Sequence, residues 1–197
     1  MAIAEKGGLL HAPELYMEKI CVGPRGAGAI DITKSLTENI KNVATKMDRK
    51  VEEINLVMLD RERHYGLMQE ARDLGARIML ISDGDVNPAM ECCIEGSGVH
   101  MVVGTGGAPE GVLAAAALKC VGGDMQARLK PETDEEIRRC HEMGIADVNQ
   151  VLTLDDLVKS DDVIFAATAI TRGNLLNPIK YFPGGARNHT IVIRTKT

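Results

Sequence analysis

Aromatic residues are scarce in this chain of 197 residues, which has no tryptophan, two phenylalanines and three tyrosines. Its hydrophobic fraction is nevertheless 45%, a typical value for a globular protein that buries a core. The core is therefore expected to consist of aliphatic residues, methionine and alanine. The length indicates one large domain, or one and a half small ones.

An excess of basic residues is also missing. The net charge is −5, which argues against general nucleic-acid binding because that function needs a basic face. No apolar run approaches the roughly 20 residues of a membrane-spanning helix, so no membrane partner is expected. The five cysteines include no Cys-x-x-Cys pair, and no signal peptide is recognisable. These features predict reduced thiols in a cytoplasmic protein.

Hydrophobic patterning predicts strands that alternate with helices after a loop-rich segment at residues 1–33. Strands are expected at 54–59, 77–81, 99–103, 125–129, 163–167 and 190–194. Helices are expected from 33 or 35 to 47, and at 65–74, 88–94, 108–119, 134–143 and 153–158. This alternation predicts an α/β fold with a mainly parallel sheet and flanking helices.

The segment Gly104–Lys119 is the most informative one. A buried strand is followed by a glycine-rich turn and then by a helix, with Pro109 and Glu110 in its first turn. Free N–H groups and the helix dipole favour a phosphate at such a place. A capped helix with a dipole-matched glutamate explains the segment equally well, because Gly-x-Gly-Gly is not a complete nucleotide-binding fingerprint.

Two further polar loops follow predicted strands, at 60–64 and 82–85. In open α/β sheets, ligands bind beyond the carboxyl ends of the strands. The three loops are therefore expected at one edge of the sheet. Taken alone, the loop at 60–64 is better explained as a solvated helix start and the loop at 82–85 as a tight turn. Because all three loops are expected at the same edge of the sheet, a binding site is the better explanation of the three together.

The residue types in these loops suit a phosphorylated polyol. Arg61, Arg63 and His64 offer guanidinium forks and an imidazole for a phosphate. Asp83 and Asp85 flank a glycine, which suits recognition of hydroxyl groups or oxygen ligation of Mg²⁺ or Mn²⁺. His64 is equally well explained as a surface residue without a role in binding. The cysteines are interpreted as structural.

The chain resembles the class II, glpX-type fructose-1,6-bisphosphatases over essentially all of its length. The matching runs are Glu5–Lys19, Asp60–His64, Ile81–Asp85, Gly106–Val112 and Arg139–Gly144. The resemblance implies a sugar-phosphatase fold of alternating helix and sheet layers. It also implies Mg²⁺- or Mn²⁺-dependent removal of the 1-phosphate from fructose 1,6-bisphosphate, and some members of the family also accept sedoheptulose 1,7-bisphosphate.

The resemblance also implies roles for particular residues. Glu110 matches a metal ligand of the family and is the catalytic candidate. The implied substrate-contacting positions are Tyr16, Arg61, Glu62, Arg63, Asp83, Gly84, Asp85 and Gly107. Relatives commonly have proline where Glu62 stands, and an acid between two arginines either weakens their phosphate contacts or points to solvent.

Chains of this family are much longer, and most of their metal-binding carboxylates precede the part that matches here. One carboxylate cannot hold a Mg²⁺ cluster. We therefore interpret the chain as a C-terminal portion that is inactive alone. On this interpretation, residues 1–33 are a remnant of the region between two halves, and 34–197 form an α/β sugar-phosphate-binding domain. The expected partners are the missing N-terminal half and further copies of the protein.

Two other functions fit parts of the pattern. The first is a non-catalytic sugar-phosphate-binding or regulatory domain that keeps the cleft. The second is a nucleotide-binding α/β module, which is disfavoured because no acidic residue follows the glycine loop at the expected distance with a second strand before it.

Overall fold

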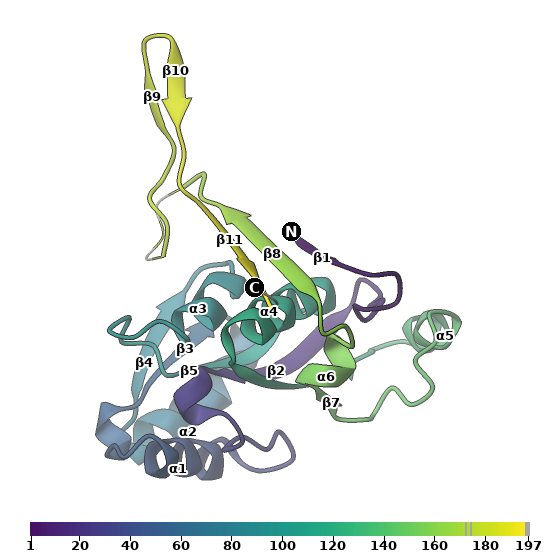
Figure 1. The fold of residues 1–197 in the computed structure, drawn as a ribbon. Helices are drawn as coiled ribbons and strands as arrows, with labels where there is room; N and C mark the ends of the chain where they lie inside the picture. The colour runs from purple at the N-terminus through teal and green to yellow at the C-terminus, as the bar shows by residue number, and fades with distance from the viewer. Residues whose placement is uncertain (172, 174, 196–197) are drawn as a thin grey trace.

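A computed structural model describes residues 1–171, 173 and 175–195 of the chain (Figure 1). The strands are β1 (Ala2–Ala4), β2 (Tyr16–Val22), β3 (Asn55–Leu59), β4 (Arg77–Ile81), β5 (Met101–Gly107), β6 (Asp124–Lys130), β7 (Leu152–Thr153), β8 (Val163–Thr168), β9 (Lys180–Phe182), β10 (Gly185–Arg187) and β11 (Thr190–Arg194). The α-helices are α1 (Leu36–Lys46), α2 (Tyr65–Leu74), α3 (Val86–Glu91), α4 (Ala108–Val121), α5 (Asp134–Glu142) and α6 (Leu154–Leu157). Short 3₁₀ helices are η1 (Pro24–Gly26), η2 (Val51–Glu53) and η3 (Glu62–His64).

A six-stranded sheet with the order β4-β3-β5-β2-β6-β7 forms the centre of the molecule. The predicted α/β fold with flanking helices is confirmed. The sheet is parallel where β3 pairs with β4 and β5, and antiparallel where β2 pairs with β5 and β6. It is therefore mixed, because β2 occupies a central place. This strand lies within residues 1–33, which were expected to be loop-rich.

Helices α1 and α2 cover one face of this sheet. The Ser35 hydroxyl accepts a hydrogen bond from the Glu38 N–H, and the Glu38 carboxylate accepts one from the Ser35 N–H, so a capping box begins α1. Gly75 ends α2 with a φ of 88°, which suits glycine. The core beneath the two helices is aliphatic and methionine-rich, as predicted, and includes Ile40, Val43, Leu56, Met58 and Met68.

Helices α3, α4 and α6 cover the opposite face, and α4 is the most buried of them. Its run of alanines, Ala114–Ala117, is at most 1% exposed. A helix that is apolar all round is expected to be covered on every side. A Cβ at Gly111 would overlap the Met17 sulfur, so this glycine lets α4 pack closely on β2.

A second sheet covers the far side of α4. It has the order β1-β8-β11, with β8 antiparallel to both neighbours. Strands β8 and β11 were expected to close the first sheet, but they form this separate layer instead. Phe165 of β8 is 1% exposed and packs beside Ala117 of α4. The molecule thus has alternating helix and sheet layers (Figure 1).

A hairpin of β9 and β10 projects away from the layered body, at the end of the β8 and β11 strands (Figure 1). Tyr181 on this hairpin is 78% exposed. None of the helices in the described part of the chain has the length and apolar character needed to cross a membrane.

Candidate functional site

The candidate site lies at the edge where β3, β4 and β5 end. Leu59 of β3 pairs with Ile81 of β4 at this edge. Because β2 is antiparallel to β5, its first residue, Tyr16, lies opposite Gly107, the last residue of β5. The sheet therefore gathers the three loops that the sequence predicted at one edge, and it adds Tyr16 from a distant segment.

The glycine-rich loop was predicted at 104–110, but residues 104–107 are in fact the end of strand β5, paired with β2. Its glycines make room for neighbouring side chains. A Cβ at Gly104 would lie 2.9 Å from the His64 ring, and one at Gly106 would lie 2.7 Å from Asp85 Oδ2. A Cβ at Gly107 would overlap the Glu110 carboxylate. The glycines therefore make room for side chains that gather at this edge of the sheet.

His64 joins two strand ends and is only 1% exposed. The Thr105 N–H donates to Nε2 over 2.8 Å, so Nε2 carries no proton. The proton is then on Nδ1, which donates to the Leu59 carbonyl over 2.8 Å. Because the backbone occupies both ring nitrogens, the expectation that His64 faces a phosphate is wrong. The imidazole instead holds the Arg61–Arg63 turn against β5.

Arg63 and Tyr16 form the exposed part of the site. The Arg63 Nε and Nη2 atoms donate to the Thr105 carbonyl over 3.1 and 2.8 Å. Its guanidinium carbon lies 4.8 Å from the centre of the Tyr16 ring, within the range of a cation–π contact. Thr105 thus fixes one edge of the guanidinium. Glu62 is exposed on the same short helix, η3.

Arg61 connects the first two predicted loops. Its Nη1 atom donates to the Asp60 carbonyl over 2.8 Å, and its Nη2 atom donates to the Ser82 carbonyl over 2.7 Å. Next to it, Gly84 has a φ of 80°, and its N–H donates to Asp83 Oδ1 over 2.9 Å. Asp83 is exposed, so it is accessible to a ligand at this edge.

Asp85 differs from Asp83 because it is buried against a lysine that the sequence pattern did not indicate as a site residue. The Lys19 Nζ atom lies 2.6 Å from Asp85 Oδ2, and the two residues are 2% and 8% exposed. A cavity of about 10 Å³, at the lower limit for one water molecule, is lined by Lys19, Asp85 and His64. The sequence held one signal for this pair. Lys19 shares a strand face with Met17 and Cys21, which are both buried.

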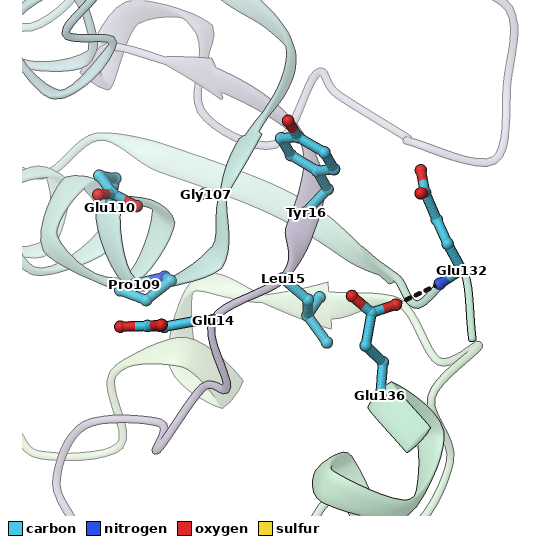
Figure 2. Close-up of a pocket in the computed structure, with 8 residues that line it drawn as sticks. All are labelled: Glu14, Leu15, Tyr16, Gly107, Pro109, Glu110, Glu132 and Glu136. Carbon is cyan, nitrogen blue, oxygen red and sulfur yellow. Dashed lines mark hydrogen bonds between the residues drawn. The ribbon is translucent and has the colours of Figure 1, made fainter. Parts of the chain in front are cut away.

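Glu110 lies in a pocket of about 440 Å³ at the start of α4 (Figure 2). Tyr16 and Gly107, two other residues selected from the sequence, also line this pocket. Three further carboxylates, which no sequence motif indicated, also line this pocket: Glu14, Glu132 and Glu136. Glu132 and Glu136 lie on the other side of Tyr16 from Glu110 (Figure 2). These two glutamates are distant in sequence from Tyr16, so only the fold shows that they line the same pocket.

The sequence matches, over residues 1–197, the family described as bacterial fructose-1,6-bisphosphatase, glpX-encoded. The chain belongs to this family. It is 44% identical over 209 residues to the D-fructose 1,6-bisphosphatase class 2/sedoheptulose 1,7-bisphosphatase of Crocosphaera subtropica. It is 43% identical to the protein of the same description from Synechococcus elongatus. Each match covers 100% of this chain and 61% of the relative, so the chain spans about three fifths of the length of these curated relatives.

The donor set in this member of the fructose-1,6-bisphosphatase family does not by itself fit a metal site. Within residues 1–171, 173 and 175–195, no group of three or more histidine, cysteine, aspartate or glutamate side chains is placed to hold a metal ion. A hard cation such as Mg²⁺ takes about six oxygen ligands. Glu110 can supply one of them from its exposed position on α4.

The cysteines of this family member are not suited to be nucleophiles. All five are unpaired. Burial raises the pKa of the Cys21 thiol to about 12, although it lies near Lys19. Burial also raises the pKa of Cys93 to about 12. A thiol acts as a nucleophile only as the thiolate, which is nearly absent at neutral pH under these conditions.

The contact between Gly107 and Glu110 leads to a prediction. In Gly107→Ala, the added methyl group would occupy the place of the Glu110 carboxylate, which must then move. We expect α4 and its core to stay intact, because the glutamate is exposed. A crystal structure of the variant checks this. A Glu110 rotamer unchanged from the wild type would show that Gly107 does not set the position of the carboxylate.

Proposed function

We propose that the protein containing this chain hydrolyses the 1-phosphate of fructose 1,6-bisphosphate, and also of sedoheptulose 1,7-bisphosphate. This chain supplies mainly the substrate-binding part of the site. One observation supports the proposal above the others. The cationic side chains of Arg61 and Arg63, the Tyr16 ring and the Asp83 carboxylate meet at one edge of the sheet. Both relatives are named for the same two activities.

The proposed roles follow from chemistry and position. Arg63, whose guanidinium is exposed and anchored on one side, binds a phosphate group of the substrate with its free N–H groups. Arg61 holds the adjoining loops and contributes positive charge. Asp83, Gly84 and Asp85 contact sugar hydroxyl groups, Asp85 from its buried position beside Lys19. Together these contacts bind and orient the bisphosphate.

The remaining substrate positions lie around the Glu110 pocket. Tyr16 covers the sugar, and the backbone of Gly107 lies against it. Glu62 is exposed between the two arginines, and we propose that its carboxylate lies at the margin of the site and leaves the phosphate contacts to them. We propose Glu110 as one ligand of Mn²⁺ or Mg²⁺, with further ligands from residues outside this chain. A bound metal of this kind would stabilise the charge that develops on the transferred phosphoryl group.

A non-catalytic function has its own supporting observation. Within the described residues, no three candidate ligands cluster for a metal, so the chain by itself matches a sugar-phosphate-binding or regulatory domain. The two proposals share the substrate contacts at the sheet edge. They differ in whether phosphate is released.

The proposed partners are the remainder of the protein and further copies of this chain. Two apolar side chains are exposed on the second sheet, Ile3 at 48% and Val192 at 64%. Exposed apolar surface of this kind marks interfaces when it is contiguous. The five unpaired cysteines fit a reducing, cytoplasmic location.

We predict that the isolated 197-residue chain releases negligible phosphate from fructose 1,6-bisphosphate, with either Mn²⁺ or Mg²⁺ present. The reason is that Glu110 alone cannot hold a catalytic metal. A protein that carries this chain within the full length of the relatives should be active under the same conditions. A phosphate-release assay of both proteins tests this. Robust metal-dependent phosphate release by the isolated chain would contradict the proposal that further metal ligands come from outside this chain. An inactive full-length protein would favour the non-catalytic function.

A further inference from the structure

A cavity of about 800 Å³ lies at the edge of the six-stranded sheet opposite to the candidate site. Asn55 and Arg77, the first residues of β3 and β4, line this cavity, as does His100, which precedes β5. Its volume falls in the usual range for small-molecule sites, about 300–1,000 Å³. None of the residues selected for fructose bisphosphate contributes to it.

Three arginines from three different segments line this space, which we call the arginine cavity. Arg25 lies on η1, Arg49 follows α1, and Arg77 begins β4. The Arg25 Nη2 atom donates to the Met47 carbonyl over 3.0 Å, so this side chain is held in place. All three arginines are exposed and can reach a ligand. Guanidinium groups match phosphate through two parallel N–H bonds.

His100 adds a hydrogen-bond donor to the arginine cavity. The Asn55 N–H donates to Nδ1 over 3.0 Å, so the ring proton is on Nε2. No residue in the described part of the chain accepts a hydrogen bond from this Nε2–H group. Burial lowers the pKa of His100, and Arg49, Arg25 and Arg77 lower it further by repulsion. The imidazole therefore lies in the combined positive field of the three guanidinium groups.

Acidic groups around the arginine cavity oppose this field in part, and Glu53 raises the pKa of His100. Two acids also line it, Glu53 and Glu95. The Glu53 carboxylate accepts the Lys50 N–H over 2.8 Å, so one of its oxygens is already engaged. The loop that carries Glu95 contains Gly96 and Gly98, with φ values of 81° and 75°. A Cβ at either glycine would meet nothing within 4 Å, so the loop leaves open space beside the cavity.

We propose that the arginine cavity binds a phosphorylated small molecule. The guanidinium groups of Arg25, Arg49 and Arg77 hold its phosphate, and His100 donates from Nε2. The cavity has room for the organic part of a metabolite as well as for the phosphate. This binding is independent of the proposed hydrolysis, because the two sites share no residue.

The test uses His100 as a local reporter, with inorganic pyrophosphate as the probe and the full 197-residue chain. The imidazole signals are followed by proton NMR across pH, with a chelator present. A bound anion favours the imidazolium form, so the pKa of His100 should rise in a saturable way. Sodium chloride must match the ionic strength, because screening of the arginines would also raise this pKa. His141 on α5 serves as the reference and should not respond.

Variants separate specific binding from a general charge effect. Arg49→Gln and Arg77→Gln should each weaken pyrophosphate binding by roughly tenfold or more, because each removes a charge-assisted contact. Arg72→Gln on α2, an exposed arginine outside the cavity, should change the affinity less than about twofold. The proposal is wrong if His100 shows no saturable response. It is equally wrong if the response persists in the Arg49→Gln/Arg77→Gln double variant, or if pyrophosphate moves other signals but not those of His100.

Discussion

Lys19→Ala is expected to lower the free energy of unfolding by about 3–5 kcal/mol. The lysine is 2% exposed and forms an ion pair of 2.6 Å with Asp85. Without it, the Asp85 carboxylate would remain buried with no opposite charge, which is far more costly than an exposed unpaired charge. Urea unfolding followed by circular dichroism measures the difference. Lys41→Ala is a matched control on α1, where the lysine is exposed, and should change stability by less than about 0.5 kcal/mol.

The double variant Lys19→Met/Asp85→Asn shows whether the cost comes from the unpaired charge. When both charges are removed, neither partner is left buried without compensation, so the double variant should be clearly more stable than Lys19→Ala. If Lys19→Ala costs less than about 1 kcal/mol, the carboxylate must have another way to be stabilised. In that case Asp85 is not positioned by Lys19, and the proposed sugar contact of Asp85 loses its structural basis.

Glu110→Gln should lower kcat by about 100-fold in a protein of the full length of the relatives, while KM changes little. A neutral amide is a poorer ligand than a carboxylate for Mn²⁺ or Mg²⁺, and a metal contributes several kcal/mol of transition-state stabilisation. Loss of an interaction that acts in the transition state appears in kcat, whereas loss of uniform binding appears in KM. Steady-state kinetics at saturating Mn²⁺ measure both constants.

The matched control for this variant is Glu52→Gln, at an exposed glutamate on η2. It removes the same charge from the chain but lies outside the Glu110 pocket, so kcat should be unchanged. If Glu110→Gln keeps the wild-type kcat, Glu110 is not a metal ligand. It then acts only as a dipole-matched residue at the start of α4, which is the alternative that the sequence left open.

Local patterns in the sequence were sufficient to predict most of the helices. Ser35 and Thr133 begin α1 and α5 with capping boxes, and Gly75 ends α2, because these signals act within a few residues. The sequence did not reveal how strands pair. Strand β2 mixes charged and apolar residues, so its pattern alone gives only a weak signal for the burial of Lys19, which the place of β2 between β5 and β6 explains.

Only part of the candidate site could be predicted, because some of its contacts also depend on how the strands pair. Arg61 and Arg63 follow β3 and could be placed at the sheet edge by a general rule about α/β folds. His64 could not be assigned in this way, because its two hydrogen bonds depend on the closeness of β3 and β5. Gly104 was interpreted as part of a phosphate-binding loop, but a glycine is needed there to make room for the His64 ring. Close packing between distant segments is not visible in a single sequence.

The most direct test of the proposed site is the affinity of the isolated chain for fructose 1,6-bisphosphate, measured by isothermal titration calorimetry. The wild-type chain should bind the sugar bisphosphate, and Arg63→Ala should weaken binding by roughly tenfold or more, because a charge-assisted phosphate contact is lost. Arg72→Ala, at an exposed arginine away from the site, should bind as the wild type does. Equal affinities for the wild type and Arg63→Ala would contradict the assignment of this sheet edge to the substrate.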